Sequence, residues 1–339
     1  MKKLPCILFI LVPILSFSQT IKGKVLDENK QPLAGANIYF DGTTIATIAD
    51  ENGNFNLNLN SKINSVLVIS FIGYQTQYIS KIEDNKELII VLNLANNTLN
   101  EVVIVKDKFS RKQKMKVFKE LFLGNSQNGA NCKITNEDEI YFEYDEKTLT
   151  LKAFSNVPLI IVNSNLNYKI NYELVNFETK FIYNTMKSQD ANRSYYAGLT
   201  RFEELNVDKN LSKKREKTYK GSQLHFFRNL VNNIWDKTNF LLFKGSLQDN
   251  PNDYFKVTKE EERFKVAVVQ QTKGLNSKNF VAEFNLLFNK KRQSKIIFET
   301  NTFYVDKFGN NSNIEEILFS GDLSQLKVGD MLPLNYGIE

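Results

Sequence analysis

Between residues 21 and 92, the sequence is a succession of short alternating runs separated by turn-forming residues. Apolar side chains recur at every second position within the runs, which is the pattern of a β-strand with one buried face. The intervening turns contain Asp-Gly and Asp-Glu-Asn-Gly, where glycine tolerates a positive φ. Seven such runs predict an antiparallel β-sandwich over residues 21–95. The runs are Ile21–Leu26, Ala36–Phe40, Thr44–Ile48, Phe55–Leu59, Val66–Phe71, Tyr78–Ile82 and Leu88–Leu92.

Five motifs in this segment carry a family resemblance. They occur in the order Gly23–Asp27, Pro32–Ile38, Gly42–Thr43, Asp50–Phe55 and Ile69–Tyr74. Together they resemble the carboxypeptidase-regulatory-like domain, a prealbumin-like β-sandwich found behind zinc carboxypeptidases and in front of many TonB-dependent outer-membrane receptors. The resemblance covers residues 21–95. The following segment, Leu99–Val105, is similar to the one that joins this domain to a receptor plug.

The two activities of such relatives are not expected here. Zinc in exported enzymes is held mostly by His with a carboxylate, and the chain contains a single histidine, His225. Zinc carboxypeptidase activity is therefore excluded. A receptor would need a plug and a barrel of several hundred residues after Val105, more than this 339-residue chain provides. We also predict no cofactor and no metal. The loop Asp50–Gly53 looks like a calcium loop, but Ile48 stands at its first ligand position, so we interpret it as a turn.

The first 18 residues have the pattern of a signal peptide. Two lysines precede the apolar stretch Leu4–Phe17, which is shorter than the roughly 20 residues that span a bilayer. Ser16 and Ser18 place small side chains before a cleavage site at Gln19. We therefore expect export to the periplasm, the outer membrane or the medium, with no integral span after cleavage; an uncleaved anchor is the alternative. Cys6 lies at the start of the apolar stretch, which argues against lipidation.

Composition narrows the choice of partners. The net charge of +6 falls to +4 when Lys2 and Lys3 leave with the signal peptide. Acidic residues alternate with basic ones, as in Lys213–Lys220, whereas a nucleic-acid surface needs an unbalanced basic stripe. We therefore expect no nucleic-acid partner. Only Cys132 remains in the mature chain, so no intrachain disulfide can form.

Residues 96–124 are predicted to be a linker followed by a short amphipathic helix. The stretch from Lys106 to Lys116 is strongly basic, and it runs into apolar residues at helical spacing. Ser110 fits an N-cap and Gly124 a helix stop. We expect the helix to face a core, with contact of the basic stretch to anionic lipid or lipopolysaccharide as the alternative.

Residues 125–339 are predicted to form a larger antiparallel β-rich domain with a helical insertion near 221–235. Apolar residues in the insertion follow helical spacing behind Ser222, a suitable N-cap. The predicted strands are Glu139–Tyr144, Thr148–Phe154, Leu159–Val162, Tyr168–Phe177, Phe181–Asn184, Phe255–Val257, Phe264–Gln270, Phe280–Phe288, Ile296–Phe303 and Glu315–Phe319.

The insertion and its border concentrate the polar and aromatic side chains that are candidates for a site. The candidates for binding are Tyr219, Arg228 and Trp235. Ser222 and His225 are the candidates for catalysis, because residues at i and i+3 on a helix lie close together. The competing interpretation is structural, with the serine occupied as an N-cap and the histidine packed and hydrogen-bonded.

Acidic residues supply the remaining candidates. A carboxylate such as Glu203 or Glu204 could complete a nucleophile relay with His225. These two acids, or those of Glu260–Glu262, could also serve glycoside hydrolysis, which needs two carboxylates about 5 to 9 Å apart. Neighbouring acids on a strand point to opposite faces, however, so a charged surface is the simpler interpretation.

These observations favour an exported, non-enzymatic cell-envelope protein that binds or supports a protein, a glycan or a surface partner. A hydrolase acting on a glycan or peptide through carboxylates or through Ser222 and His225 is one alternative. An accessory to TonB-dependent uptake is another.

Overall fold

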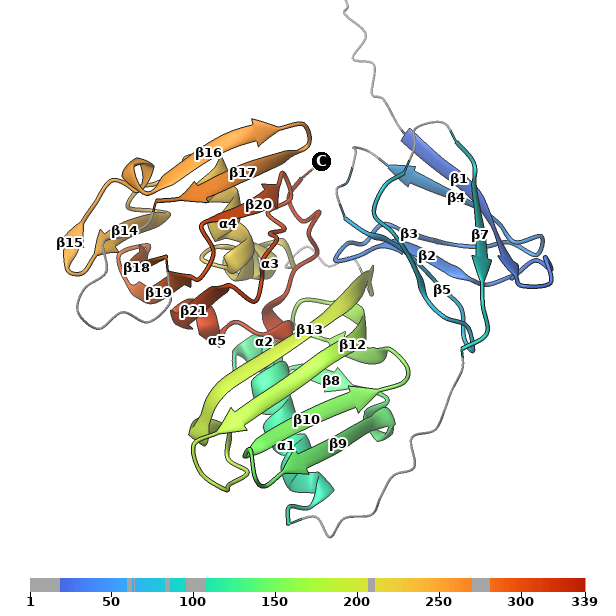
Figure 1. Cartoon of the computed structure of the whole chain (residues 1–339), viewed down its shortest axis with the longest axis horizontal. Helices are drawn as coiled ribbons and strands as arrows, with labels where there is room; N and C mark the ends of the chain where they lie inside the picture. Colours follow the sequence, from blue (N-terminus) through green and yellow to red (C-terminus); the bar gives the residue numbers. More distant parts are fainter. Residues whose placement is uncertain are drawn as a thin grey trace, which may run out of the picture.

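The computed structural model describes residues 19–59, 63, 65–82, 86–95, 108–206, 211–269 and 281–338. The predicted signal peptide and the receptor-like segment Leu99–Val105 lie outside these residues. The described chain is mainly β, as predicted, and its strands form five sheets around three hydrophobic clusters (Figure 1). We call the parts around these clusters the sandwich unit (19–95), the middle unit (108–206) and the C-terminal unit (211–325), and residues 326–338 the closing segment. The region predicted as one β-rich domain thus holds two of the three clusters.

The sandwich unit has two sheets, ordered β4-β1-β7 and β3-β2-β5-β6. All of its strand pairs are antiparallel except β1 with β7, which is parallel. The parallel pair is close at Gly23, where an added Cβ would lie 2.4 Å from the carbonyl oxygen of Leu88. The strands are β1 (Gln19–Asp27), β2 (Asn37–Phe40), β3 (Ala46–Ile48), β4 (Asn54–Leu59), β5 (Leu67–Ser70), β6 (Gln77–Ile79) and β7 (Leu88–Leu92).

The middle unit begins with α1 (Arg111–Phe122), which occurs where the sequence predicts it. The side chain of Ser110 accepts a hydrogen bond from the amide of Gln113, and the Gln113 side chain bonds back to form a capping box. Helix α1 is followed by α2 (Gln127–Ala130) and by a sheet that α1 covers on one face. The strands of this sheet are β8 (Cys132–Ile134), β9 (Ile140–Asp145), β10 (Thr150–Ser155), β11 (Leu159–Asn163), β12 (Tyr168–Phe181) and β13 (Ala191–Glu204).

The long strands β12 and β13 form the longest strand pair of this sheet. Each has 14 residues, and their antiparallel register shifts between Leu174 and Asn176. Gly198 lies opposite Leu174, and a Cβ there would stand 2.2 Å from the ring of Tyr172. This close approach explains the glycine. The sequence does not predict β13, because its residues lack a clear apolar alternation.

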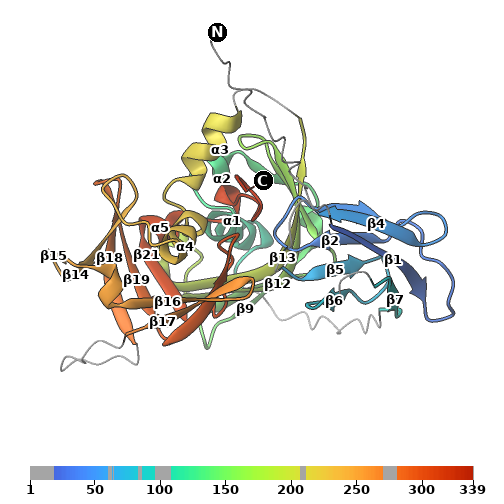
Figure 2. The same cartoon turned by 90° about the horizontal axis from the view of Figure 1, so that it is seen from above.

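The C-terminal unit places α4 against two sheets, ordered β15-β14-β18-β19-β21 and β16-β17-β20 (Figure 2). The predicted strand Ile296–Phe303 is in fact two strands, β19 and β20, separated by a turn, and α3, β14 and β15 are not predicted at all. The elements are α3 (Leu211–Tyr219), α4 (Gln223–Val231), β14 (Phe240–Lys244), β15 (Leu247–Gln248), β16 (Phe255–Glu260), β17 (Arg263–Val268), β18 (Ala282–Phe288), β19 (Arg292–Phe298), β20 (Thr302–Asp306), β21 (Ile317–Gly321) and α5 (Asp322–Gln325).

The turn after β2 attaches the sandwich unit to the free edge of β13. The amide of Gly42 donates to the carbonyl of Thr200 at 2.7 Å, and the amide of Phe202 donates to the carbonyl of Thr43 at 2.9 Å. The side chain of Asp41 accepts from the amide of Thr200 at 2.6 Å. The turn therefore extends the middle sheet by a short bridge, and Thr43 is fully buried there.

The C-terminal unit and the closing segment also contact the sandwich unit. The turn after β20 carries Phe308, a residue that is 2% exposed and belongs to the hydrophobic cluster of the sandwich. In the closing segment, the amide of Leu334 donates to the carbonyl of Gly42 at 2.7 Å, and the side chain of Asn335 bonds that of Thr44. The three units are therefore joined by backbone hydrogen bonds and shared apolar packing.

Candidate functional site

Ser222 and His225 lie together at the start of α4, where both are engaged by the backbone. Ser222 is the N-cap, and its Oγ accepts a hydrogen bond from the amide of His225 at 3.1 Å. The His225 Nδ1 accepts from the amide of Gly221 at 3.0 Å. A relay would need a hydrogen bond from the serine hydroxyl to an imidazole nitrogen, but Nδ1 is already occupied.

The environment of His225 keeps its imidazole neutral. The residue is 7% exposed and lies between the rings of Tyr219, Phe240 and Phe288. Burial lowers the pKa of His225 to about 4, and the positive charge of Arg228 acts in the same direction. A general base is most effective with a pKa near the working pH, so this histidine suits packing better than proton transfer at neutral pH.

Arg228 clamps two remote segments. Its Nε donates to the carbonyl oxygen of Phe308 at 2.8 Å, its Nη1 to that of Tyr336 at 2.9 Å, and its Nη2 to that of Leu334 at 2.8 Å. The guanidinium also lies 5.2 Å from the centre of the Tyr219 ring. Arg228 is 8% exposed, so this candidate for ligand binding is occupied by the chain itself, and Tyr219 packs beside it.

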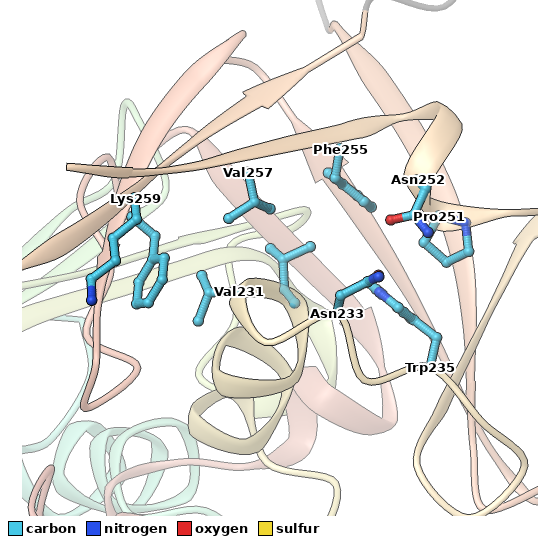
Figure 3. A pocket seen from close by; sticks show the side chains of 10 residues that line it. Val231, Asn233, Trp235, Pro251, Asn252, Phe255, Val257 and Lys259 are labelled. Atoms are coloured by element: carbon cyan, nitrogen blue, oxygen red, sulfur yellow. The ribbon is translucent and has the colours of Figure 1, made fainter.

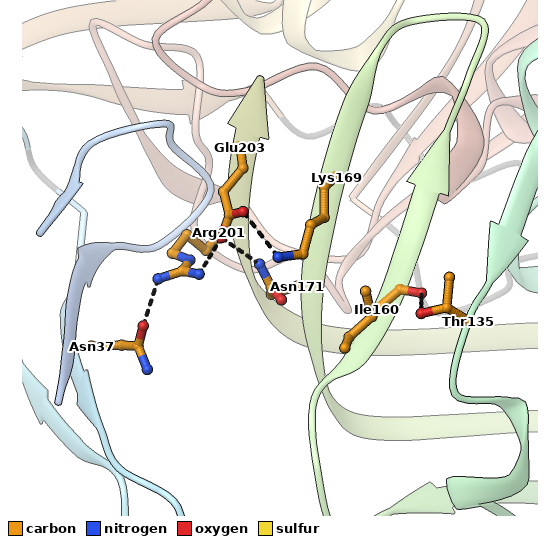
Figure 4. A network of polar contacts seen from close by, with 7 residues as sticks. All are labelled: Asn37, Thr135, Ile160, Lys169, Asn171, Arg201 and Glu203. Atoms are coloured by element: carbon orange, nitrogen blue, oxygen red, sulfur yellow. Dashed lines mark hydrogen bonds and ion pairs between the residues drawn. The ribbon is translucent and has the colours of Figure 1, made fainter. Parts of the chain in front are cut away.

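The adjacent acids Glu203 and Glu204 face different partners. Glu203 lies on the outer face of the middle sheet, in a network with Arg201, Lys169 and Asn171 that reaches Asn37 of the sandwich unit (Figure 4). Burial alone would raise the pKa of Glu203, but the hydrogen bond from Lys169 and the charge of Arg201 hold it below its usual value.

Glu204 pairs instead with Arg215 of α3 at 2.9 Å. The other acidic cluster, Glu260–Glu262, comprises the last residue of β16 and the two-residue turn of the β16–β17 hairpin, where Glu261 takes a φ of 50°. Neither cluster lines either of the two cavities described below.

Trp235 borders an open groove between the end of α4 and β16. A cavity of about 310 Å³ there is lined by residues of α4 and β16, and the side chains of Val257 and Phe255 face Val231 across it (Figure 3). A second cavity of about 490 Å³ extends toward β14. The two share Asn233, Trp235, Pro251 and Asn252. We call their combined space the Trp235 groove.

The end of α4 positions the polar side of this groove. The helix closes with a Schellman motif, in which the amide of Ile234 donates to the carbonyl of Asn229 and that of Asn233 to Leu230. Asn233 has a φ of 54°, the left-handed conformation that asparagine tolerates better than most residues. Trp235 follows two residues later, with its ring parallel to that of Phe255 at 6.1 Å.

The sequence identified Trp235 but not its neighbours in the groove. Asn233, Pro251 and Asn252 come from two segments that only the fold brings together. The run Gln248–Asn252, in which amides flank a proline, was an available signal for an exposed polar loop. Among the described residues, no group of three or more His, Cys, Asp or Glu side chains is placed to hold a metal ion.

Comparison with known proteins identifies the sandwich unit. Residues 21–104 match the family model of the CarboxypepD_reg-like domain, which confirms the resemblance noted in the sequence. Within the described part of the chain, no helix has the length and apolar character to cross a bilayer.

The relatives matched over this segment are TonB-dependent receptors. SusC of Bacteroides thetaiotaomicron is 38% identical over 98 residues, which are 28% of this chain and 9% of the receptor. Receptor P39 of Formosa agariphila is 31% identical over 91 residues, 27% of this chain and 9% of the receptor. The chain thus spans about a tenth of the length of these relatives. Among solved structures, a chain of a type II cohesin–X-dockerin complex from Acetivibrio cellulolyticus is similar over 22% of this chain and 56% of that chain. The sequence identity is 22% and the TM-score is 0.20.

Proposed function

We propose that this protein is a non-enzymatic component of the cell envelope that binds a partner through its C-terminal unit, with the sandwich unit as a fixed support. The observation that carries the proposal is the engagement of Ser222, His225 and Arg228 in hydrogen bonds that hold the fold together. Side chains used in this way do not form a nucleophile and base. The Trp235 groove, by contrast, is open to solvent, and we assign its lining side chains no comparable role in joining segments of the fold.

The sandwich unit contacts both other units, which favours its role as a fixed support. A flexible tether would need few contacts between units, since domains move freely unless their interface is extensive. Here the Asp41–Thr44 turn pairs with β13, and Phe308 enters the sandwich core. The partner would therefore be presented in a fixed orientation relative to the sandwich.

The experiment is expression of the full chain in a Gram-negative host, followed by fractionation and intact-mass measurement. We expect a mature protein that begins at Gln19, located in the envelope fraction, and no turnover of glycan or peptide substrates. Turnover that disappears in Ser222→Ala or His225→Gln would contradict the proposal. Substitution of Asn56, which is exposed on β4, gives a control that leaves the site untouched.

A role beside TonB-dependent uptake is the second candidate, and the similarity of the sandwich unit to receptor segments favours it. Co-purification of a receptor with the wild-type protein would support this role. Loss of that receptor when the sandwich face is altered at exposed Ile89 of β7, with retention after Ile48→Ala on β3 of the other sheet, would locate the contact.

A further inference from the structure

We propose that the Trp235 groove is a binding site for a neutral oligosaccharide of hexose units. The proposal rests on the proposed function, because it names the ligand of the same C-terminal unit. It is argued from the shape, hydrogen-bonding capacity and charge of the groove.

The groove has the volume of a small-ligand site and is long enough for more than one sugar residue. The two cavities, of about 310 and about 490 Å³, each fall within the usual range of roughly 300 to 1,000 Å³ for ligand pockets. They meet at Asn233, Trp235, Pro251 and Asn252 and are open to solvent. An elongated ligand can therefore occupy both while its ends extend into water.

One set of lining groups is apolar and flat. Trp235 and Phe264 supply partly exposed rings, and Val257 supplies exposed aliphatic surface, whereas Phe255 and Pro251 are buried behind them. Such surfaces favour the carbon-bound hydrogens on the face of a pyranose ring, since an aromatic ring carries negative charge on its face and buries a large apolar area. Trp235 lines both cavities, which places it at the centre of the groove.

The other set consists of neutral amides. The side chains of Asn233, Asn252 and Gln248 line the groove, and an amide offers two donors and one acceptor with two lone pairs. Paired donors and acceptors of this kind match vicinal hydroxyl groups, each of which both donates and accepts. Figure 3 shows Asn252 above Asn233 at the same end of the smaller cavity, beside Trp235, so both can reach one ligand.

The charges of the groove favour a neutral ligand. Lys259 lines the smaller cavity and Asp249 the larger one. The Asp249 carboxylate is already bonded, accepting from the hydroxyl of Tyr254 at 2.5 Å and from the amide of Asn250 at 2.9 Å. A single lysine at one end does not make an anion site, and no lining carboxylate is left unpaired for a cation.

The test uses intrinsic fluorescence, because Trp235 is the only tryptophan of the chain. The full protein is titrated with maltohexaose, cellohexaose and mannohexaose, and calorimetry is run in parallel. We expect a saturable change in emission with at least one of them, unaffected by salt at about 0.5 M. Asn252→Ala should weaken that binding about fivefold or more, since one hydrogen bond contributes about 1 kcal/mol.

Asn233→Gly is the matching variant, because glycine retains the left-handed conformation while removing the amide. It should also weaken binding about fivefold, whereas Asn56→Ala on β4 of the sandwich should leave it unchanged. If a hexaose changes the emission of the wild-type protein but both groove variants bind it with wild-type affinity, the groove is not the binding site and the proposal is overturned.

Three further outcomes decide the ligand class. Absence of binding by all three hexaoses up to about 10 mM, by fluorescence and by calorimetry, overturns the inference but leaves the proposed function standing. Tighter binding of hexagalacturonate, or of an extended decapeptide that pairs with the edge strand β16, also overturns it. Cleavage of a bound hexaose, detected by mass spectrometry, would instead contradict the non-enzymatic function while supporting the site.

Discussion

The guanidinium of Arg228 holds Phe308 by its backbone, with Nε 2.8 Å from the carbonyl oxygen, while the ring of Phe308 lies in the core of the sandwich unit. The same guanidinium bonds the carbonyls of Leu334 and Tyr336 in the closing segment. One side chain of α4 thus fixes two segments that both contact the sandwich. This relationship places Arg228 in the joint between the units rather than in a ligand site.

Arg228→Lys should lower the free energy of unfolding by about 3 kcal/mol. Lysine retains the charge but cannot reach three carbonyls in one plane, and buried carbonyls left without a donor are costly. The measurement is a urea titration. Arg193→Lys is the control, because Arg193 is exposed on β13; an equal effect of both substitutions would show that the clamp contributes nothing.

Phe308→Ala should lower the unfolding free energy by about 4 kcal/mol, the usual cost of truncating a buried aromatic side chain. The cavity would open inside the sandwich cluster although the residue belongs to the C-terminal unit. We therefore expect faster limited proteolysis within residues 19–95. Cleavage confined to the C-terminal unit would show that the two parts are not coupled through this ring.

Gly198→Ala should destabilise the protein by about 3 kcal/mol, because the new methyl group would stand 2.2 Å from the ring of Tyr172 and 2.3 Å from the carbonyl of Glu173. Gly245→Ala is the matched comparison. It meets no atom within 4 Å and has only its φ of 60° to oppose it, so it should cost about 1 kcal/mol. Similar unfolding midpoints for the two variants would contradict the steric explanation.

The imidazole of His225 should titrate with a pKa of about 4. Because it is the only histidine, its ring resonances can be followed directly by NMR. The unfolded chain takes up this proton near pH 6.5, so folding stability should fall as the pH is lowered from 6.5 toward 4. His225→Gln should remove that part of the acid sensitivity, and a titration midpoint near 6.5 would show that the ring is not desolvated.

Asp306 should act in the opposite direction over a similar range. Burial raises its pKa to about 6, against the hydrogen bonds that Oδ1 accepts from the amides of Phe308 and Asn310. The folded protein therefore binds this proton more tightly than the unfolded chain, and its stability should fall as the pH rises from about 4 through 6. Asp306→Asn should flatten this dependence, measured by urea midpoints across that range; an unchanged dependence would show that this carboxyl does not hold the proton.

Short-range patterns were sufficient for much of the fold. The alternation of apolar residues in 21–92 predicted the sandwich. Ser110 as the N-cap and Gly124 as the stop predicted α1. Both signals are local, because periodicity and capping depend on neighbours within a few positions. The same reasoning placed Ser222 at the start of α4. It missed α3, whose residues are mostly charged and lack an apolar stripe.

By itself, therefore, the sequence determined the class of fold, the family resemblance of residues 21–95, which the family model matches over 21–104, and the elements whose signals are local. Only the tertiary structure decided that Gly42 would pair with Thr200, that Phe308 would enter the sandwich, and that Arg228 would be used by the chain itself. It also decided that Asn233 and Asn252 would face one groove beside Trp235. These contacts join residues far apart in the chain, and the residue types involved satisfy their hydrogen bonds equally well in many other arrangements, so no local pattern specifies them.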